Sequence, residues 1–211
     1  MIQDVYICCQ MKEKFHKIVH NTQIYVWEIT LHSSDLATNP LLNSEDIISA
    51  GNIKNEKRKK EFLSSRIALK KIFNKDLELK HLKSGRPNID EAEYISISHS
   101  SNFLAIAFGK ENIGIDIEKP QNRMLKMMPK ILSEKEQLEF SKTPSIDLAC
   151  KLWGTKEAIL KHIGNKNLNY KNDINVEYIS SGKAKYLTTK FNVVFEKIEA
   201  MILTYVVRCN T

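Results

Sequence analysis

Long hydrophobic runs are missing from this sequence. Its most apolar stretches, FLAIAF at 103–108 and MILTYVV at 201–207, have the length of single strands, whereas a membrane-spanning helix needs about 20 apolar residues. The N-terminal stretch MIQDVYICCQMKEKFHK lacks the continuous apolar core of a secretory signal. These absences predict a cytoplasmic protein that does not cross a membrane.

Cysteine is scarce, and its spacing argues against two kinds of site. Cys8 and Cys9 are adjacent while Cys150 and Cys209 are isolated, so there is no C-x-x-C pair to indicate zinc or redox chemistry. We interpret all four as reduced structural thiols. Two histidines four residues apart near the N-terminus have no third ligand beside them and do not indicate a zinc site.

Negative charge is in the minority. The 211 residues include 32 Lys and Arg against 25 Asp and Glu, a formal net charge of +7. This excess favours an anionic partner, which could be a nucleic acid, an acidic protein or a phosphate-rich small molecule. Much of it lies in the helical stretch 55–73, whose basic residues are not interleaved with aromatics. A basic nucleic-acid-binding protein therefore remains an alternative rather than the first hypothesis.

The predicted elements indicate an α+β chain. We predict helices over 43–52, 55–73, 132–140 and 145–164, and strands over 24–31, 93–98, 103–109, 113–118, 174–179, 184–189, 191–196 and 201–207. The short connections between 93 and 118 favour a meander of three neighbouring strands. The order strand, helices, strands, helices, strands suits two similar α/β halves in a pseudo-two-fold arrangement, 1–111 and 112–211.

The stretch NIGIDIEK has an acidic face. Ile113, Ile115 and Ile117 alternate along a predicted strand, so Asp116 and Glu118 point together to its other side. A solvated sheet edge could tolerate this repulsion. A cation held between the two carboxylates would relieve it.

The predicted helix 145–164 has stripes on two opposite sides. The apolar stripe consists of Leu148, Leu152, Ile159 and Ile163, and the other of Trp153, Glu157 and Lys161. Glu157 and Lys161 could form a surface ion pair worth about 0.3–0.5 kcal/mol. A Trp away from the core stripe fits a second buried or ligand-facing surface better.

GIDIE, followed about 35 residues later by WGTKEAILK, resembles the paired signature of the 4′-phosphopantetheinyl transferases. SGRP and SISHS upstream add to the resemblance, which is sharp over residues 84–161 and diffuse elsewhere. Size and strand pattern resemble the monomeric, surfactin-synthetase-activating type rather than the half-length trimeric holo-acyl-carrier-protein synthase type. The resemblance implies the 4′-phosphopantetheinyl transferase fold.

It also implies an activity. These enzymes transfer the phosphopantetheine arm of coenzyme A to a serine of an apo acyl or peptidyl carrier protein and release adenosine 3′,5′-bisphosphate. Coenzyme A is then the substrate, Mg²⁺ or in its place Mn²⁺ the cofactor, and an acidic carrier of fatty-acid, polyketide or nonribosomal-peptide synthesis the partner. A carrier-binding module without catalysis is the alternative within this resemblance.

The resemblance assigns the site residues. Asp116, Glu118 and Glu157 become metal ligands, because Mg²⁺ prefers carboxylate oxygens. The two lysines of the second motif, Lys156 and Lys161, become catalytic contacts for coenzyme A phosphates. Lys156 would stabilise charge on the diphosphate, and Lys161 would help the leaving phosphate. In LSEKE, Glu136 becomes a candidate general base for the carrier serine, although a helix cap reaching back to the preceding serine explains it equally well.

The remaining assignments concern the nucleotide end of coenzyme A. Ser98 and His99 are implied contacts of the adenosine bisphosphate. Arg86, where the family more often has Lys, is assigned to the adenine and ribose end, and its different geometry could shift that contact. Arg66 is the best match for a 3′-phosphate ligand and Lys60 a weaker one. Gly154 departs from the hydroxyl residue or Cys that is common in the family.

Overall fold

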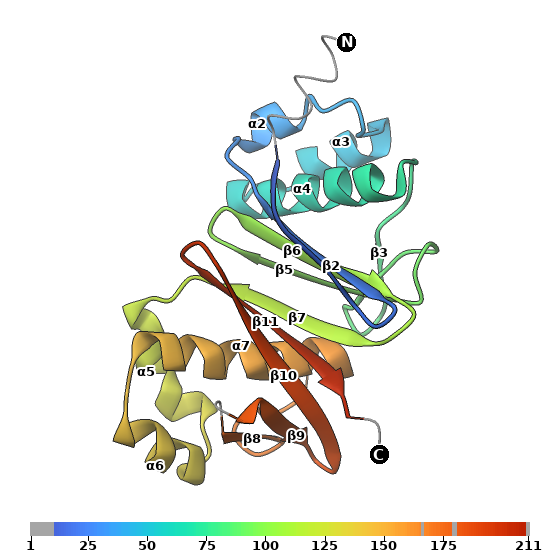
Figure 1. Cartoon of the computed structure of the whole chain (residues 1–211). Coiled ribbons are helices and arrows are strands. Elements are labelled where there is room, and N and C mark those ends of the chain that lie inside the picture. Colours follow the sequence, from blue (N-terminus) through green and yellow to red (C-terminus); the bar gives the residue numbers. More distant parts are fainter. Residues whose placement is uncertain (1–10, 166, 179–180, 210–211) are drawn as a thin grey trace.

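The structure is a computed structural model that describes residues 11–165, 167–178 and 181–209. It is built in four layers, with one group of helices, two antiparallel sheets and a second group of helices (Figure 1). The layers follow the chain, because the first sheet and its helices come from the first half and the second sheet and its helices from the second.

The first sheet has the strand order β1-β2-β6-β5. Its strands are β1 (Lys12–Val19), β2 (Thr22–Glu28), β5 (Tyr94–Ser100) and β6 (Phe103–Gly109). Both faces of this sheet are covered, and alternate residues of β6 point to opposite faces. Leu104 and Ile106 pack in the core beneath the first helices, whereas Phe103, Ala105 and Ala107 face the second sheet.

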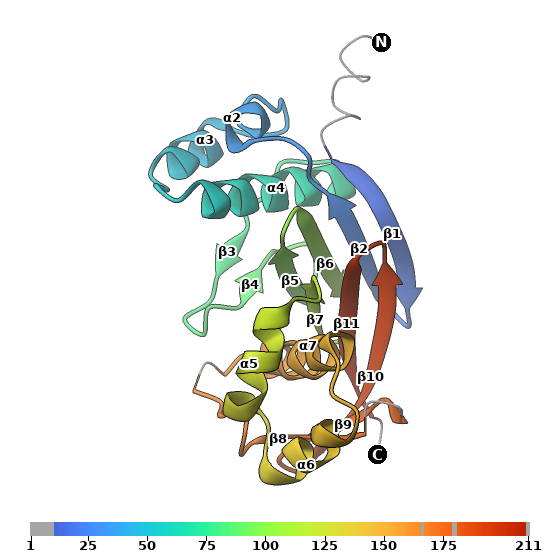
Figure 2. The same ribbon diagram turned by 90° about the vertical axis from the view of Figure 1, so that its left-hand side faces the viewer.

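Three helices cover the outer face of the first sheet: α2 (Ser33–Leu36), α3 (Ser44–Gly51) and α4 (Glu56–Phe73). In α4, the Asn55 side chain accepts a hydrogen bond from Arg58 N at 3.0 Å, and Asn74 ends the helix in the left-handed conformation. Two short strands, β3 (Lys80–His81) and β4 (Pro87–Asn88), pair with each other and lie below this helix in Figure 2.

The second sheet has the strand order β7-β11-β10-β9-β8. Its strands are β7 (Ile113–Glu118), β8 (Ile174–Tyr178), β9 (Lys183–Tyr186), β10 (Thr189–Ile198) and β11 (Met201–Arg208). Its helices are α5 (Asn122–Ile131), α6 (Glu134–Lys142) and α7 (Ile146–Ile163). The longest, α7, runs along the sheet and shares a core with α5 and β10.

The predicted three-stranded meander is wrong. The strands β5 and β6 pair as a hairpin, but β7 leaves that sheet and pairs with β11, placing Asp116 opposite Thr204. Short connections are compatible with either partner, and the choice depends on a strand about 90 residues further along the chain. The alternation along β7 is confirmed, since Ile113, Ile115 and Ile117 face the first sheet.

One glycine lets α7 lie directly on β7. A Cβ at Gly114 would come within 1.9 Å of the carbonyl oxygen of Ala158 and 2.8 Å of the amide nitrogen of His162. No side chain fits at that distance, so the helix backbone takes the space that a Cβ would fill. The close approach brings the second motif, on α7, onto the strand that carries the first.

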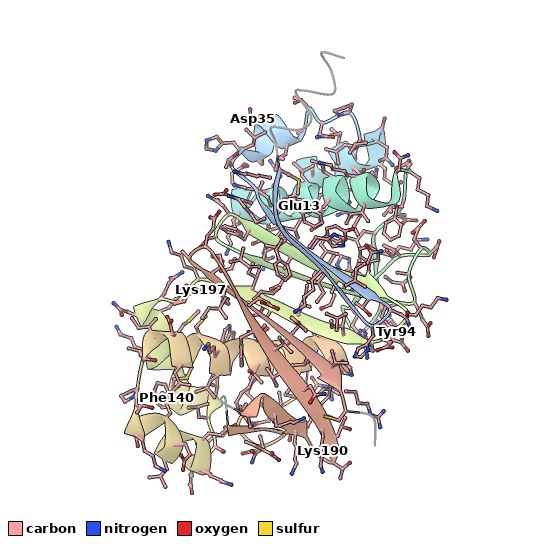
Figure 3. The ribbon with its side chains drawn as sticks, in the orientation of Figure 1. Glu13, Asp35, Tyr94, Phe140, Lys190 and Lys197 are labelled. Atoms are coloured by element: carbon pink, nitrogen blue, oxygen red, sulfur yellow. The ribbon has the colours of Figure 1, made fainter. Side chains whose placement is uncertain are left out.

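The two sheets share an apolar core. Ile24 and Val26 of the first sheet pack with Ile115, Leu203 and other residues of the second, and side chains fill the space between the layers (Figure 3). At one side β1 runs along the β10–β11 hairpin (Figure 2), where Lys14 lies 2.5 Å from Glu199 and Lys17 lies 2.7 Å from Glu196. The two halves therefore pack as one body.

The sequence predicted most of these elements and missed five of them. The helices over 43–52, 55–73, 132–140 and 145–164 and the strands from 93 onward are confirmed within a few residues, while β2 ends at Glu28 rather than 31. The elements β1, α2, β3, β4 and α5 were not predicted. The mixed α+β class is confirmed, and the pseudo-two-fold relation stays a prediction. Among the described residues, every helix is too short or too polar to cross a membrane.

Candidate active site

A row of serine hydroxyls joins β5 to β7. Ser96 Oγ accepts a hydrogen bond from the backbone N–H of Ile115, and Ser98 Oγ accepts one from Ile117, each at 3.2 Å. Because β11 occupies the other edge of β7, these hydroxyls satisfy amide groups that a neighbouring strand would otherwise bind. The SISHS motif therefore joins the two halves where β5 lies beside the acidic strand β7, and we call this junction the seam.

Asp116 lies at the centre of this seam and is 4% exposed. Its Oδ1 accepts hydrogen bonds from Ser98 Oγ at 2.9 Å and from Lys161 Nζ at 2.8 Å. Its Oδ2 is buried and has no hydrogen-bond partner within the described parts of the chain. Gly154 faces this oxygen, since a Cβ there would lie 3.6 Å from it. A buried carboxylate oxygen without a partner is costly, and it is suited to a cation.

Glu118, two residues further along β7, points to the same side. Its carboxylate accepts a hydrogen bond from Ser100 Oγ at 2.7 Å and lies 3.8 Å from Arg123 Nη2. Burial raises the pKa of Glu118, and the negative charge of Asp116 raises it further. The strand thus holds two carboxylates in a poorly solvated place.

Glu157 comes to the same region from α7. The phenol of Tyr170 donates a hydrogen bond to its Oε1. Burial raises the pKa of Glu157, and the charges of Asp116 and Glu118 raise it further. A strand and a distant helix therefore bring three carboxylates within electrostatic reach of one another.

The fit of a divalent cation rests on the donor chemistry. Among the described residues, no group of three or more His, Cys, Asp or Glu side chains is arranged closely enough to hold a metal ion. The positive charge next to the Asp116 carboxylate is the ammonium group of Lys161. The unpartnered Asp116 Oδ2 and the mutual repulsion of three hard oxygen donors nevertheless fit Mg²⁺. Asp116, Glu118 and Glu157 stay predicted ligands.

A cavity of about 450 Å³ opens beside the carboxylates, between α4, β5 and the end of α7. Its cationic and imidazole side chains are Arg58, Arg66, Arg86, Lys161, His81 and His99. Its apolar lining includes Phe62, Ile95, Ile97 and Leu160. This combination suits a ligand with both phosphate groups and a flat ring.

Lys161 links the cavity to the carboxylates. It lines the cavity, its side chain is 23% exposed, and its ammonium group donates to Asp116 Oδ1 and to Ser98 Oγ, each at 2.8 Å. The alternative of a surface pair with Glu157 is not what the structure shows, because Asp116 is the carboxylate that Lys161 contacts. An anion bound in the cavity would therefore lie near an ammonium group that also contacts the acidic strand.

Two arginines line the cavity at positions that the sequence indicated. Arg66 Nε lies 2.9 Å from Asp46 Oδ1, so part of its charge is already paired. Arg86 donates from Nη2 to Asn112 Oδ1 at 3.0 Å. Its stem crosses the end of α7 at Gly164, where a Cβ would lie 2.2 Å from Arg86 Cδ. Both groups remain candidates for the nucleotide end of a ligand.

His99 and Ser98 have different surroundings although they are adjacent. His99 lines the cavity, and its Nε2 lies 3.0 Å from Ser65 Oγ. Burial lowers the pKa of His99 to about 3, and the nearby charge of Lys161 adds to this, so the imidazole is neutral near pH 7. Ser98 faces Asp116 and Lys161 instead, which places it at the carboxylates rather than in the cavity wall.

The structure does not place Lys60 at the cavity. Its ammonium group donates to the carbonyl oxygen of Ile29 at 2.8 Å and to Asn102 Oδ1 at 3.0 Å, so it stabilises a loop. Arg58 lines the cavity in its stead and was missed. The signal was available, because Arg58 lies eight residues before Arg66 and the two therefore share a helix face.

Glu136 and Lys156 bind each other in the interior. Lys156 Nζ lies 2.8 Å from Glu136 Oε2, and both side chains are almost fully buried. Glu136 Oε2 also accepts from Ser133 N at 2.7 Å, and its Oε1 accepts from Val176 N at 2.7 Å. The capping interpretation is thereby confirmed as geometry. The predicted contact of Lys156 with phosphate disagrees with its position, because its ammonium group is buried and does not line the cavity.

The fold and the site define an α+β protein in which carboxylates of a strand and a helix lie beside a cation-lined cavity. The family model of the 4′-phosphopantetheinyl transferase superfamily matches residues 112–200, so this part of the chain is similar to that superfamily. The matched residues carry the three carboxylates and Lys161, but not the cavity residues of α4 and β5. No curated protein matches the chain.

Proposed function

We propose that this protein transfers the 4′-phosphopantetheine arm of coenzyme A to a serine hydroxyl of an apo carrier protein. The observation that carries the proposal is the position of Lys161. Its side chain lines the cationic cavity and at the same time forms an ion pair with the buried carboxylate of Asp116. A substrate with a nucleotide at one end and a diphosphate at the other would span both regions. The family match to residues 112–200 supports the same reaction class.

The cavity would bind the nucleotide end. Arg58, Arg66 and Arg86 would contact phosphate oxygens, because guanidinium groups bind phosphate in a fork geometry. His99, which is neutral, would line this end of the cavity without adding charge. The apolar part of the lining would take the adenine ring.

Transfer needs the serine oxygen in line with the phosphorus that carries pantetheine. As that new bond forms, the serine hydroxyl loses its proton to solvent water, the diphosphate P–O bond breaks, and adenosine 3′,5′-bisphosphate leaves with the electron pair. Lys161 would hold the diphosphate and stabilise the negative charge that develops on the leaving phosphate. In this geometry Glu136 is not free to accept the serine proton, since both its oxygens are hydrogen-bonded in the interior.

Mg²⁺ would be held by Asp116, Glu118 and Glu157, and when bound it would neutralise diphosphate charge as a Lewis acid. Burial and mutual repulsion raise the pKa of both glutamates, and the charge of a bound cation would offset that repulsion. Ser98 and Ser100 orient two of them by hydrogen bonds.

The partner would be an acidic carrier protein, in agreement with the net charge of +7. We further propose that the enzyme works in the cytoplasm as a monomer, of the surfactin-synthetase-activating type. Carriers of fatty-acid, polyketide and nonribosomal-peptide synthesis are all candidates.

The test is mass spectrometry of apo carrier proteins of these three kinds after incubation with the protein, coenzyme A and Mg²⁺. Addition of the phosphopantetheine arm to one of them is the expected result. The variants Asp116→Asn and Glu157→Gln keep side-chain size and should lower the transfer rate at least about 100-fold, since each removes charge from the reacting centre.

Asp35→Asn is the matched control, because this exposed carboxylate lies on α2, at the far end of the molecule from the site (Figure 3). It should leave the rate unchanged. A wild-type protein that binds carriers without modifying them would instead be a binding module, and one that shifts duplex or single-stranded nucleic acid in a salt-dependent manner would support the nucleic-acid alternative.

A further inference from the structure

Residues 167–173, which lie between α7 and β8, are rich in asparagine and have a defined conformation. The side chain of Asn169 accepts hydrogen bonds from the backbone N–H groups of Lys171 and Asn172, each at 3.0 Å. Its own N–H donates to Asp173 Oδ2 at 2.8 Å. Leu168, which is 7% exposed, anchors the loop in the second core. Such side-chain to backbone bonds fix a turn locally.

Tyr170 stands at the centre of this turn and reaches back to α7. Its phenol donates to Glu157 Oε1, and its ring centroid lies 5.6 Å from that of Trp153. The ring therefore packs on the same helix stripe that carries the carboxylate. Neither contact follows from spacing within the helix, because the tyrosine belongs to another element.

The backbone of Tyr170 is held by the residue of α7 that precedes Glu157. Lys156 Nζ donates to the carbonyl oxygen of Tyr170 at 2.8 Å and to that of Ile174 at 2.9 Å. The same ammonium group is bound to Glu136. Lys156 and Glu157 are neighbours in sequence, so one helix turn holds both the main chain and the phenol of the tyrosine.

We propose that Tyr170 is a positioning residue, whose phenol fixes the Glu157 carboxylate toward Asp116 and Glu118 so that the three can share a divalent cation. The inference rests on the proposed function. A glutamate has three rotatable side-chain bonds, and a hydrogen bond to one oxygen restricts its rotamer. It does so at a position where the charges of Asp116 and Glu118 act on the Glu157 carboxylate. Partners that orient a ligand in this manner typically change metal affinity or activity by about 10–100-fold when removed.

The same arrangement assigns a role to the buried side chain of Lys156. Lys156 donates a hydrogen bond to the Tyr170 carbonyl and so fixes the position of this tyrosine along the helix axis. The lysine would therefore act on Glu157 indirectly, through Tyr170. Glu136 supplies the charge that keeps this ammonium group buried.

The experiment uses Tyr170→Phe in the full chain, with Tyr25→Phe as the matched control. Both changes remove one phenol oxygen and keep the ring, and the Tyr25 phenol donates to Gln23 at 2.8 Å in the first sheet, away from the site. The first readout is the affinity for Mn²⁺ in the presence of coenzyme A, followed by the loss of the free-ion signal in electron paramagnetic resonance. We expect Tyr170→Phe to weaken it about tenfold or more and Tyr25→Phe to leave it unchanged.

The second readout is the dependence of pantetheine transfer on Mg²⁺. Tyr170→Phe should need a higher Mg²⁺ concentration for half-maximal rate, while the KM for coenzyme A stays within a factor of two or so of wild type. Equal Mn²⁺ affinity and equal Mg²⁺ dependence in Tyr170→Phe and wild type would overturn the inference, whether or not the melting temperature falls. A wild-type chain that binds Mn²⁺ but modifies no carrier would defeat the proposed function instead, and the Mn²⁺ affinities of the two variants would still decide the role of Tyr170.

Discussion

Lys156 illustrates how one residue can match a motif and still have a role that the motif does not suggest. Its ammonium group has no exposed surface and is surrounded by Glu136 and two backbone carbonyl groups. Burial lowers the pKa of Lys156, and the charge of Glu136 opposes that effect. Such a pair is destabilising to break, because the remaining partner becomes an uncompensated buried charge.

Glu136→Gln should therefore destabilise the fold by about 3–5 kcal/mol. The amide supplies no negative charge to Lys156, and its NH₂ group cannot accept the hydrogen bond that either Ser133 N or Val176 N now donates. Urea unfolding measures the loss. The control is Glu139→Gln on the same helix, whose carboxylate pairs with Lys142 at the surface and should matter by less than about 1 kcal/mol. Unchanged stability together with a collapse of the transfer rate would restore the general-base interpretation of Glu136.

At the scale of elements, the close contact of α7 with β7 decides the geometry of the site. The strand presents Asp116, and the helix presents Glu157 and Lys161. Their separation depends on how near the helix axis can come. Gly114 sets that distance, because the Ala158 carbonyl occupies the volume of the absent Cβ.

Gly114→Ala should destabilise the protein by about 1–3 kcal/mol or more, since the added methyl group meets helix backbone rather than a flexible side chain. It should also lower pantetheine transfer by moving α7 away from the strand. Gly51→Ala in α3 is the control, as a Cβ there has nothing within 4 Å, and it should be neutral or stabilising by up to about 1 kcal/mol. The measurements are urea denaturation and the transfer rate of both variants; a stable, fully active Gly114→Ala would show that α7 can adjust.

At the scale of the whole molecule, the two halves are joined through apolar faces of both sheets. The residues between them include Ile24 and Ala105 from the first half and Ile117, Leu203 and Tyr205 from the second, all at most 2% exposed. The ion pairs along β1 and β10 lie at the surface and contribute little beside this burial. The site lies at the same seam, so its integrity depends on the halves staying together.

Neither half, 1–111 or 112–211, should fold alone, because each would expose the inner face of its sheet to water. We expect each separate half to lack a cooperative thermal transition, and a mixture of the two to recover one together with coenzyme A binding. A sharp transition in either isolated half would show instead that the halves are independent domains.

The sequence by itself determined what local periodicity can determine. A period of two placed Asp116 and Glu118 on one face of a strand, and a period of 3.6 placed Trp153, Glu157 and Lys161 on one stripe of a helix. The beginning of α6 followed from its capping residue Ser133.

Only the tertiary structure decided the partners across the chain. The pairing of β7 with β11, the burial of Lys156 against Glu136, the loop position of Lys60 and the bond from Tyr170 to Glu157 all join different elements. Spacing along the chain carries no record of these contacts, because they depend on which surfaces become buried together when the sheets and helices pack. The residue types of the site were thus legible in the sequence, and their roles were set by packing.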